Sequence, residues 1–214
     1  MTAIKVLKAR LPNGNKAKAE LIYDQHATNP REWANLGTIL IAPNKAHWIA
    51  NRDDVVDTSC LGKNPYEHWN NLRREQLKLK KSDIAIAYPI TKHEHGEISL
   101  QLGYKSGWDY GVVGFVYVTK EQVRKCYGVD RITKSIIERA KNCLQDELDM
   151  LTRWLNDDCY GWQIKECALT DDGLDWEEVD TLDACWGYFG KEQALDDMQN
   201  MLKLLTATNQ PEEV

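Results

Sequence analysis

The sequence has little that would point to a membrane or to secretion. No uninterrupted apolar run in its 214 residues approaches the roughly 18–20 residues that a membrane-spanning helix needs. The first residues lack the basic, apolar and small-residue pattern of a secretory signal. Proline is scarce, at six residues, while 43% of the chain is hydrophobic and eight residues are Trp, which excludes a disordered low-complexity protein. We therefore expect a folded, cytoplasmic protein with no membrane partner.

The cysteines lack the spacing of a disulfide or metal framework. There are six, widely spread and without any Cys-x-x-Cys pair. A chain of this length can bury a core without covalent staples. We expect reduced, mostly buried thiols at Cys60, Cys126, Cys143, Cys159, Cys167 and Cys185.

Three widespread motifs of nucleotide binding and catalysis are also absent. They are the G-x-x-x-x-G-K-[ST] phosphate loop, the G-x-S-x-G nucleophile elbow and the G-x-G-x-x-G dinucleotide fingerprint. Their absence leaves the common nucleotide-binding and acyl-transfer sites without support. We expect no cofactor, and a protein that binds rather than catalyses.

Charge is present in abundance but is unevenly distributed. The chain has 27 Lys and Arg against 33 Asp and Glu, a formal net charge of −6. Residues 1–134 contain 21 basic and 14 acidic side chains, a balance of +7, whereas residues 135–214 contain 6 and 19, a balance of −13. This asymmetry indicates surfaces of opposite sign, which favours a binding function.

The spacing of apolar residues predicts a series of strands and helices. Residues 43–65 have no clear period and indicate a long surface loop. The polar segment 92–96 is expected to be a hairpin tip, and 179–189 to be one or two strands. The predicted strands are 4–11, 19–23, 37–42, 84–88, 98–102, 111–119, 159–169 and 179–189, and the predicted helices are 65–80, 120–126, 134–155 and 193–205.

These elements favour one fold class. Strands and helices are segregated rather than strictly alternating, which is typical of α+β proteins. We expect a single α+β domain over residues 1–205 and a flexible polar tail over 206–214. A mixed or antiparallel sheet, with 111–119 near its centre, is expected to pack against the two longer helices of the C-terminal half.

Two groups of residues have the chemistry of a metal site. His93 and His95 are two residues apart, so an extended backbone places both imidazoles on one face, although zinc needs a third ligand. Asp157 and Asp158, followed by Gln163 and Lys165, could form the acidic cluster and strand lysine of a nuclease. An exposed hairpin tip and an acidic helix end explain the same residues. We expect no metal, and a metal-dependent hydrolase or nuclease is the alternative function.

Two charged surfaces are candidates for partner binding. The basic one would contact nucleic-acid phosphates or an acidic protein, and it consists of Arg73, Arg74, Lys78, Lys80 and Lys81. A nucleic-acid-binding accessory protein that uses this run is a second alternative function. The acidic one would dock on a basic protein, in a groove built for DNA or guide RNA, and it consists of Asp157, Asp158, Asp171, Asp172, Asp175, Glu177 and Glu178.

Four segments form a distinctive set of landmarks. They are Asn-Pro-Arg-Glu-Trp-Ala-Asn-Leu-Gly-Thr at 29–38, Trp-Asp-Tyr-Gly-Val-Val-Gly-Phe-Val-Tyr-Val at 108–118, Leu-Asn-Asp-Asp-Cys-Tyr-Gly-Trp at 155–162 and Ala-Cys-Trp-Gly-Tyr-Phe-Gly at 184–190. In this order, they resemble the landmarks of an uncharacterised family of proteins carried by bacteriophages and other mobile elements. Position 34 departs from the family pattern, because Ala34 stands where an Asp is usual.

The resemblance implies an accessory protein of a mobile element, a class that includes anti-CRISPR and antirestriction inhibitors of host defence. We therefore expect a protein that binds and inhibits a host defence complex in the bacterial cytoplasm, with a CRISPR effector as the first candidate. Its partner would be a protein or a ribonucleoprotein. Direct contact with nucleic acid and the oligomeric state are left open.

Overall fold

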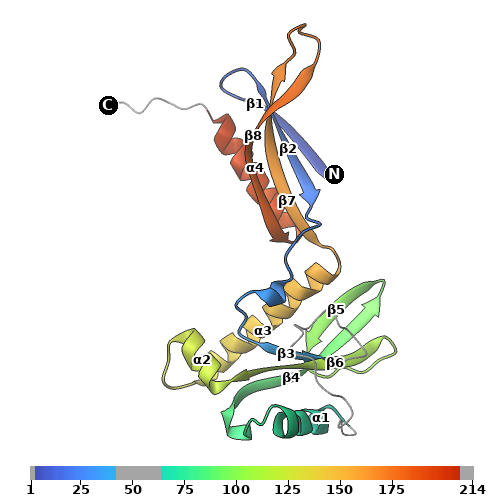
Figure 1. Ribbon diagram of the computed structural model, residues 1–214, viewed down its shortest axis with the longest axis vertical. Coiled ribbons are helices and arrows are strands. Elements are labelled where there is room, and N and C mark those ends of the chain that lie inside the picture. The colour runs from blue at the N-terminus through green and yellow to red at the C-terminus, as the bar shows by residue number, and fades with distance from the viewer. Residues whose placement is uncertain (1–2, 42–63, 208–214) are drawn as a thin grey trace. The chain divides into compact units, whose positions relative to one another are not determined.

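The computed structural model describes residues 3–41 and 64–207, and Figure 1 shows their helices and strands. These residues form two antiparallel sheets and four α-helices, so the predicted α+β class is confirmed. Contacts divide the chain into two compact units: unit 1 is Met1–Thr28 with Asp157–Val214, and unit 2 is Asn29–Asn156. Each has its own core and is described by itself, and the single domain over 1–205 stays a prediction.

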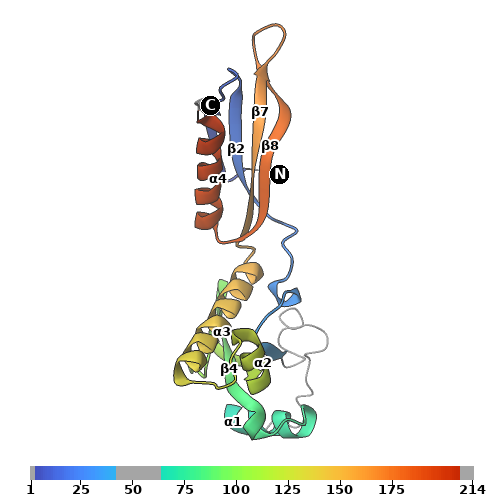
Figure 2. The same ribbon diagram turned by 90° about the vertical axis from the view of Figure 1, so that its left-hand side faces the viewer.

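Unit 1 is a four-stranded antiparallel sheet with one helix on one of its faces (Figure 2). The helix is α4 (Lys191–Thr206), and the strands, in spatial order, are β1 (Lys5–Arg10), β2 (Lys16–Tyr23), β7 (Cys159–Leu169) and β8 (Trp176–Phe189). Alternate residues of the strands point to α4, and those in the middle of the sheet are apolar. The buried core consists of Leu11, Ala17, Ala19, Leu21, Tyr160, Trp162, Ile164, Ala194, Met198 and Leu202.

Unit 2 is a second four-stranded antiparallel sheet, in the order β3 (Thr38–Ile41), β6 (Tyr110–Thr119), β4 (Ile84–His95) and β5 (Glu97–Leu102). Helix α3 (Lys134–Leu155) packs on one face, mainly against β5. On the other face, Leu40 and Phe115 pack with Leu72, which follows helix α1 (Pro65–Asn71). Strand β6 lies inside the sheet, as the apolar run 111–119 predicts.

Local signals place the helices of unit 2. Helix α2 (Lys120–Tyr127) begins after Thr119, whose side chain caps it, and ends at Gly128 in the left-handed conformation. Helix α3 is capped by Thr133 and buries the stripe Ala140, Leu144, Leu148 and Leu151. None of the described helices combines the length and the apolar character that crossing a membrane requires.

Four expectations need comment. The helix predicted over 65–80 is shorter: α1 ends at Asn71 and continues as a π turn, Leu72–Gln76, before Lys78 adopts a φ of 55°. The predicted tip 92–96 is mostly strand, because β4 runs to His95 and the turn is made by Gly96. The segment 179–189 belongs to one strand that begins earlier, at Trp176. The predicted loop 43–65 and tail 206–214 lie outside the described residues apart from their ends.

A buried ion pair holds the first residues of unit 2 against helix α3. Arg31 is 5% exposed, and its Nη1 lies 3.2 Å from Oε2 of Glu147 on α3, while its Nη2 donates to the Gly37 carbonyl at 2.6 Å. The same carboxylate accepts the amide of Leu36 at 2.6 Å. Gly37 is tightly enclosed, because a Cβ there would lie 2.5 Å from Leu144 Cδ2. The 29–38 landmark therefore ties the chain to α3.

The contacts of Glu147 with Arg31 and Leu36 lead to a stability prediction. Glu147→Ala removes the carboxylate that pairs with the buried Arg31 guanidinium and accepts the Leu36 amide, so we expect a loss of about 3–5 kcal/mol in the free energy of unfolding of unit 2. Urea denaturation measures it. Asp146→Ala, on the exposed side of the same helix, is the matched control and should change stability by less than about 0.5 kcal/mol. Equal losses of stability in the two variants would contradict this role of Glu147.

Candidate binding surfaces

The sheet of unit 1 has a second face, opposite α4, that no other described element of this unit covers (Figure 2). We call it the open face. Directly paired residues of antiparallel strands project to the same side, so the register defines rows across it. The first row is Arg10, Lys16, Cys167 and Glu178, the second Lys8, Lys18, Lys165 and Thr181, the third Val6, Glu20, Gln163 and Ala184, and the fourth Ile22, Gly161 and Trp186.

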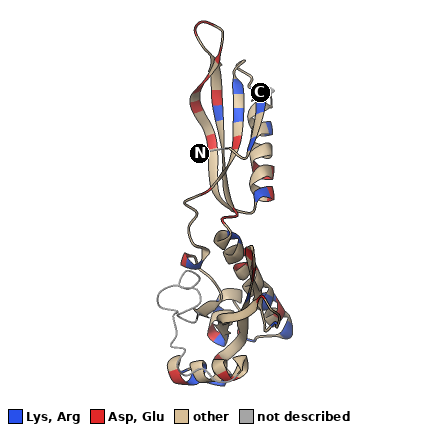
Figure 3. Cartoon of the chain, turned by 90° about the vertical axis from the view of Figure 1, so that its right-hand side faces the viewer, with Lys and Arg blue, Asp and Glu red and all other residues tan. Residues whose placement is uncertain are grey.

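An ion-pair cluster occupies the middle of the open face, and Figure 3 shows the basic and acidic segments on the strands that form it. Lys18 Nζ lies 2.6 Å from Glu20 Oε1 and 2.8 Å from Glu178 Oε1, and Lys165 Nζ lies 2.6 Å from Glu178 Oε2. Gln163 Nε2 donates to Glu20 at 2.9 Å. The cluster joins three strands and is electrically neutral, because its lysines and glutamates are equal in number.

The protonation of this cluster follows from its contacts. Hydrogen bonds from Lys165 and Lys18 lower the pKa of Glu178 below its usual value. Burial works to raise the pKa of Glu20, but hydrogen bonds from Lys18 and Gln163 outweigh it, and the pKa is lowered. Hydrogen bonds to both glutamates raise the pKa of Lys18. Lys18, Glu20 and Glu178 are therefore charged at neutral pH.

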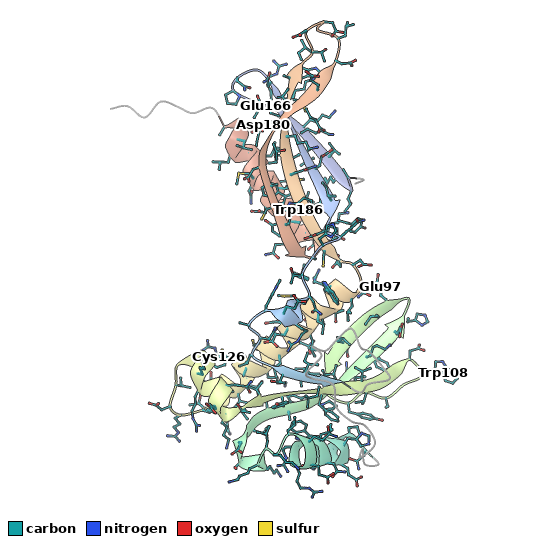
Figure 4. All side chains as sticks on the ribbon, viewed as in Figure 1. Glu97, Trp108, Cys126, Glu166, Asp180 and Trp186 are labelled. Carbon is teal, nitrogen blue, oxygen red and sulfur yellow. The ribbon has the colours of Figure 1, made fainter. Side chains whose placement is uncertain are left out.

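Two exposed indoles flank the cluster. Trp186 packs directly on Gly161, where a Cβ would come within 2.1 Å of its ring, and 44% of Trp186 stays exposed (Figure 4). At the other end, Lys16 Nζ lies 3.8 Å from the ring centroid of Trp176, a cation–π contact. The open face thus combines ionised groups with aromatic surface.

The two C-terminal landmarks interlock around this site. Tyr160 pairs with Tyr188 and Trp162 with Cys185 across β7 and β8. On the α4 side, Trp162 Nε1 donates to Asp197 Oδ2 at 3.1 Å, and the Tyr188 hydroxyl donates to the same carboxylate. Burial and the hydrogen bond to Asp197 raise the pKa of Tyr188. These residues hold α4 on the sheet, so their role in the structure is packing.

The outer part of the β7–β8 hairpin forms a distinct acidic surface. Strand β2 pairs with β7 only up to Cys167, so residues 168–180, which we call the acidic hairpin, have no strand on that side. This segment contains no Lys or Arg (Figure 3), and its six acidic side chains are all exposed: Asp171, Asp172, Asp175, Glu177, Glu178 and Asp180. Apolar side chains are exposed with them, with Leu174 80% and Val179 52% accessible.

The loop of the acidic hairpin is internally ordered. Thr170 Oγ1 donates to Asp172 Oδ1 at 2.6 Å, and the Leu174 amide donates to the same oxygen at 3.1 Å. The Thr170 hydrogen bond, followed by that of Leu174, lowers the pKa of Asp172. Gly173 supplies the positive φ of 71° that closes the turn. Asp172 therefore shapes the loop, whereas Asp171, Asp175 and Glu177 are left to face solvent.

The structure does not gather all seven acidic candidates. Asp157 and Asp158 precede β7, and the 11 residues of this strand separate them by about 37 Å from the hairpin loop. Glu178 is neutralised by Lys18 and Lys165. Of the predicted acidic surface, only the hairpin residues form one contiguous group.

The nuclease arrangement is not assembled either. Asp158 and Lys165 are seven residues apart on an extended chain, or about 24 Å, and Lys165 is ion-paired with Glu178. Gln163 is bonded to Glu20. Within residues 3–41 and 64–207, no group of three or more His, Cys, Asp or Glu side chains could hold a metal ion.

The two histidines share a face, as their spacing predicts. The rings of His93 and His95 are 6.5 Å apart and stacked, and His93 lies 4.6 Å from Tyr110. His95 Nδ1 is 3.4 Å from Asp109 Oδ2. Beside them, Trp108 is fully exposed and points away from the strands (Figure 4).

The basic run lies on irregular backbone rather than on one helix face. Arg73 Nη1 donates to the Leu79 carbonyl at 2.5 Å, and Arg74 pairs with Glu75 at 2.8 Å. Lys78, Lys80 and Lys81 are exposed on the turns that follow. The five cysteines in the described residues are free thiols, two of them buried, and Cys60 lies outside those residues.

The open face was missed by sequence reasoning, although a signal for it exists. Lys8 and Arg10, like Lys16 and Lys18, alternate with residues that point to α4. Such alternation shows that one face is charged, but not that β2 lies beside β7, because more than 130 residues separate the two strands. The cross-strand partners therefore could not be named.

Comparison with known proteins adds no relative: no protein-family model, no curated protein and no solved structure matches this chain.

The ion-pair cluster makes a pH prediction. Because the pKa of Glu178 is lowered in the folded protein, its stabilising contribution is complete above its usual value of 4.5 and is lost as the pH falls through the lower folded value. We expect Glu178→Gln to cost about 0.5 kcal/mol at neutral pH and to cost less in acid. Urea denaturation across this range measures the difference. Glu177→Gln is the control, and a constant cost for Glu178→Gln at every pH would contradict the prediction.

Proposed function

We propose that this protein is a mobile-element accessory protein that binds and inhibits a host defence complex, with a CRISPR effector as the first candidate partner. The observation that carries the proposal is the acidic hairpin, an exposed segment with six carboxylates, no basic residue and exposed apolar side chains. The resemblance of the four landmarks to mobile-element proteins supports the biological setting.

The chemistry of the acidic hairpin fits a basic partner. Carboxylates spaced along an exposed strand and loop attract a surface that binds phosphates, and they raise the rate of encounter with it. Leu174 and Val179 add apolar area, which supplies affinity that salt does not screen. A groove that binds DNA or guide RNA offers such a basic surface. Occupying it would block the nucleic acid without any chemical step.

The hydrogen bonds in the loop favour a preformed element. Thr170 bonds both Asp172 and the backbone of Asp175, so the hairpin loses little conformational freedom when it docks. The lysines that flank it, Lys18 and Lys165, are already paired with Glu178. Among the described residues, the carboxylates of the hairpin that neither pair with a lysine nor order the loop are therefore Asp171, Asp175, Glu177 and Asp180.

This assignment defines the experiment. We expect the triple variant Asp171→Lys/Asp175→Lys/Glu177→Lys, which spares the loop contact of Asp172 and the ion pairs of Glu178, to bind purified CRISPR effectors at least about tenfold more weakly at low salt. The difference should shrink as ionic strength rises. Biolayer interferometry at several salt concentrations measures binding, and a plasmid-interference assay in the bacterial host measures inhibition.

A matched control separates local from global charge. Glu138→Lys/Asp146→Lys/Asp196→Lys makes the same change in net charge at exposed positions of α3 and α4. It should bind and inhibit as the unmodified protein does. The proposal fails if the hairpin variant retains full inhibition, or if the unmodified protein protects a plasmid from no CRISPR system tested.

A further inference from the structure

The open face of unit 1 has a chemistry different from that of the acidic hairpin. Its rows contain five basic side chains, Lys8, Arg10, Lys16, Lys18 and Lys165, against the two acidic side chains Glu20 and Glu178. The positive charge is concentrated in the first two rows, and the fourth is apolar and aromatic. Along the strands, the open face thus changes from mainly basic in the first two rows to apolar and aromatic in the fourth.

The excess charge is available for a ligand. Lys18 and Lys165 are neutralised within the cluster, whereas Lys8 and Arg10 on the edge strand are exposed and have no carboxylate partner among the described residues. Lys16 Nζ lies over the ring of Trp176, and no carboxylate among the described residues pairs with it. The carboxylates of the hairpin loop lie beyond the first row, and the potential of each is screened over about 8 Å at physiological salt.

We propose that the open face binds single-stranded nucleic acid. The phosphates would lie on Lys8, Arg10 and Lys16, and a base would stack on the exposed ring of Trp186, which Gly161 allows to rest on the sheet. Trp176 supplies a second aromatic surface at the first row. Gln163 and the cluster between them present hydrogen-bonding groups to the bases.

The dimensions of the face fit this ligand. Successive rows are two residues apart, so the first and fourth rows are separated by about 20 Å, at about 3.4 Å per residue. A single strand of about four nucleotides covers that length on a small sheet module. A duplex has its bases stacked inside and would meet the lysines only, without reaching Trp186. An acidic protein would likewise contact the basic side chains, but it would give no role to the exposed indole of Trp186.

The proposal is independent of the acidic hairpin and can be tested without knowing the protein partner. Fluorescence anisotropy with labelled single-stranded RNA and DNA oligonucleotides, and with a duplex of the same length, measures binding to the full chain at low salt. We expect both single strands, or one of them, to bind more tightly than the duplex. The preference between RNA and DNA identifies the natural ligand.

Variants assign the binding to the open face. Lys8→Glu/Arg10→Glu should weaken single-strand binding by about tenfold or more, with a shallower salt dependence. Trp186→Ala should weaken it by about tenfold, and Trp186→Phe should retain most of it, because a smaller ring still stacks. Circular dichroism and urea denaturation confirm that each variant is folded.

The matched control carries the same change in charge on the opposite side of the sheet. Lys191→Glu/Lys203→Glu alters two exposed lysines of α4 and should leave binding within about twofold. The proposal is overturned if the unmodified protein binds no single strand, if the duplex binds equally well, if the control weakens binding as much as Lys8→Glu/Arg10→Glu, or if Trp186→Ala has no effect. Displacement of the oligonucleotide by an equal charge concentration of poly-glutamate would assign the face to an acidic protein instead.

Discussion

Unit 1 depends on an asymmetry between the two faces of its sheet. One face buries apolar side chains under α4, and the indole of Trp162 and the phenol of Tyr188 fix the helix through Asp197. The opposite face has no helix within the unit, so its strands must be held together by contacts that tolerate water. The paired lysines and glutamates, and the indole of Trp186 on Gly161, are contacts of this kind. The surface that is left for a ligand is therefore also the surface that joins β2, β7 and β8.

In unit 2, by contrast, both faces of the sheet are covered by other elements. Helix α3 packs on one side, and Leu72 with Trp69 packs on the other, so β6 can be apolar at almost every position. The exposed aromatic and charged groups of unit 2 accordingly lie on loops, turns and helices, as Trp108, Lys78 and Asp146 do, or at the tip of the β4–β5 hairpin, as Glu94 and His95 do. This difference explains why the ordered rows of charge occur in unit 1, although much of the basic sequence belongs to unit 2.

Local sequence patterns predicted most helices and strands, whereas the pairing of strands that are distant in the sequence could not be predicted. Thr119, Gly128 and Thr133 mark helix ends through their own hydrogen bonds and backbone angles, which a single sequence reveals. The π turn after Asn71 has no comparable signal, so the helix there was extended too far. The separation into two units is invisible for another reason: unit 2 is inserted between β2 and β7, which are neighbours in one sheet, and no change in composition marks the junction.

The landmark segments contribute mainly to the fold, whereas the charged surfaces that would select a partner lie mostly outside them. Arg31 and Gly37 tie the chain to α3, and Gly161 and Tyr188 shape the sheet and hold α4. The acidic hairpin and the basic rows lie outside these segments, because Lys8, Arg10 and residues 168–180 belong to none of them. Proteins that share the landmarks are thus expected to share this architecture while differing in charge at both surfaces. Trp186 is the exception, since it is a landmark residue that is also exposed on the open face, and its burial against Gly161 satisfies the fold while the free side of the ring remains for a ligand.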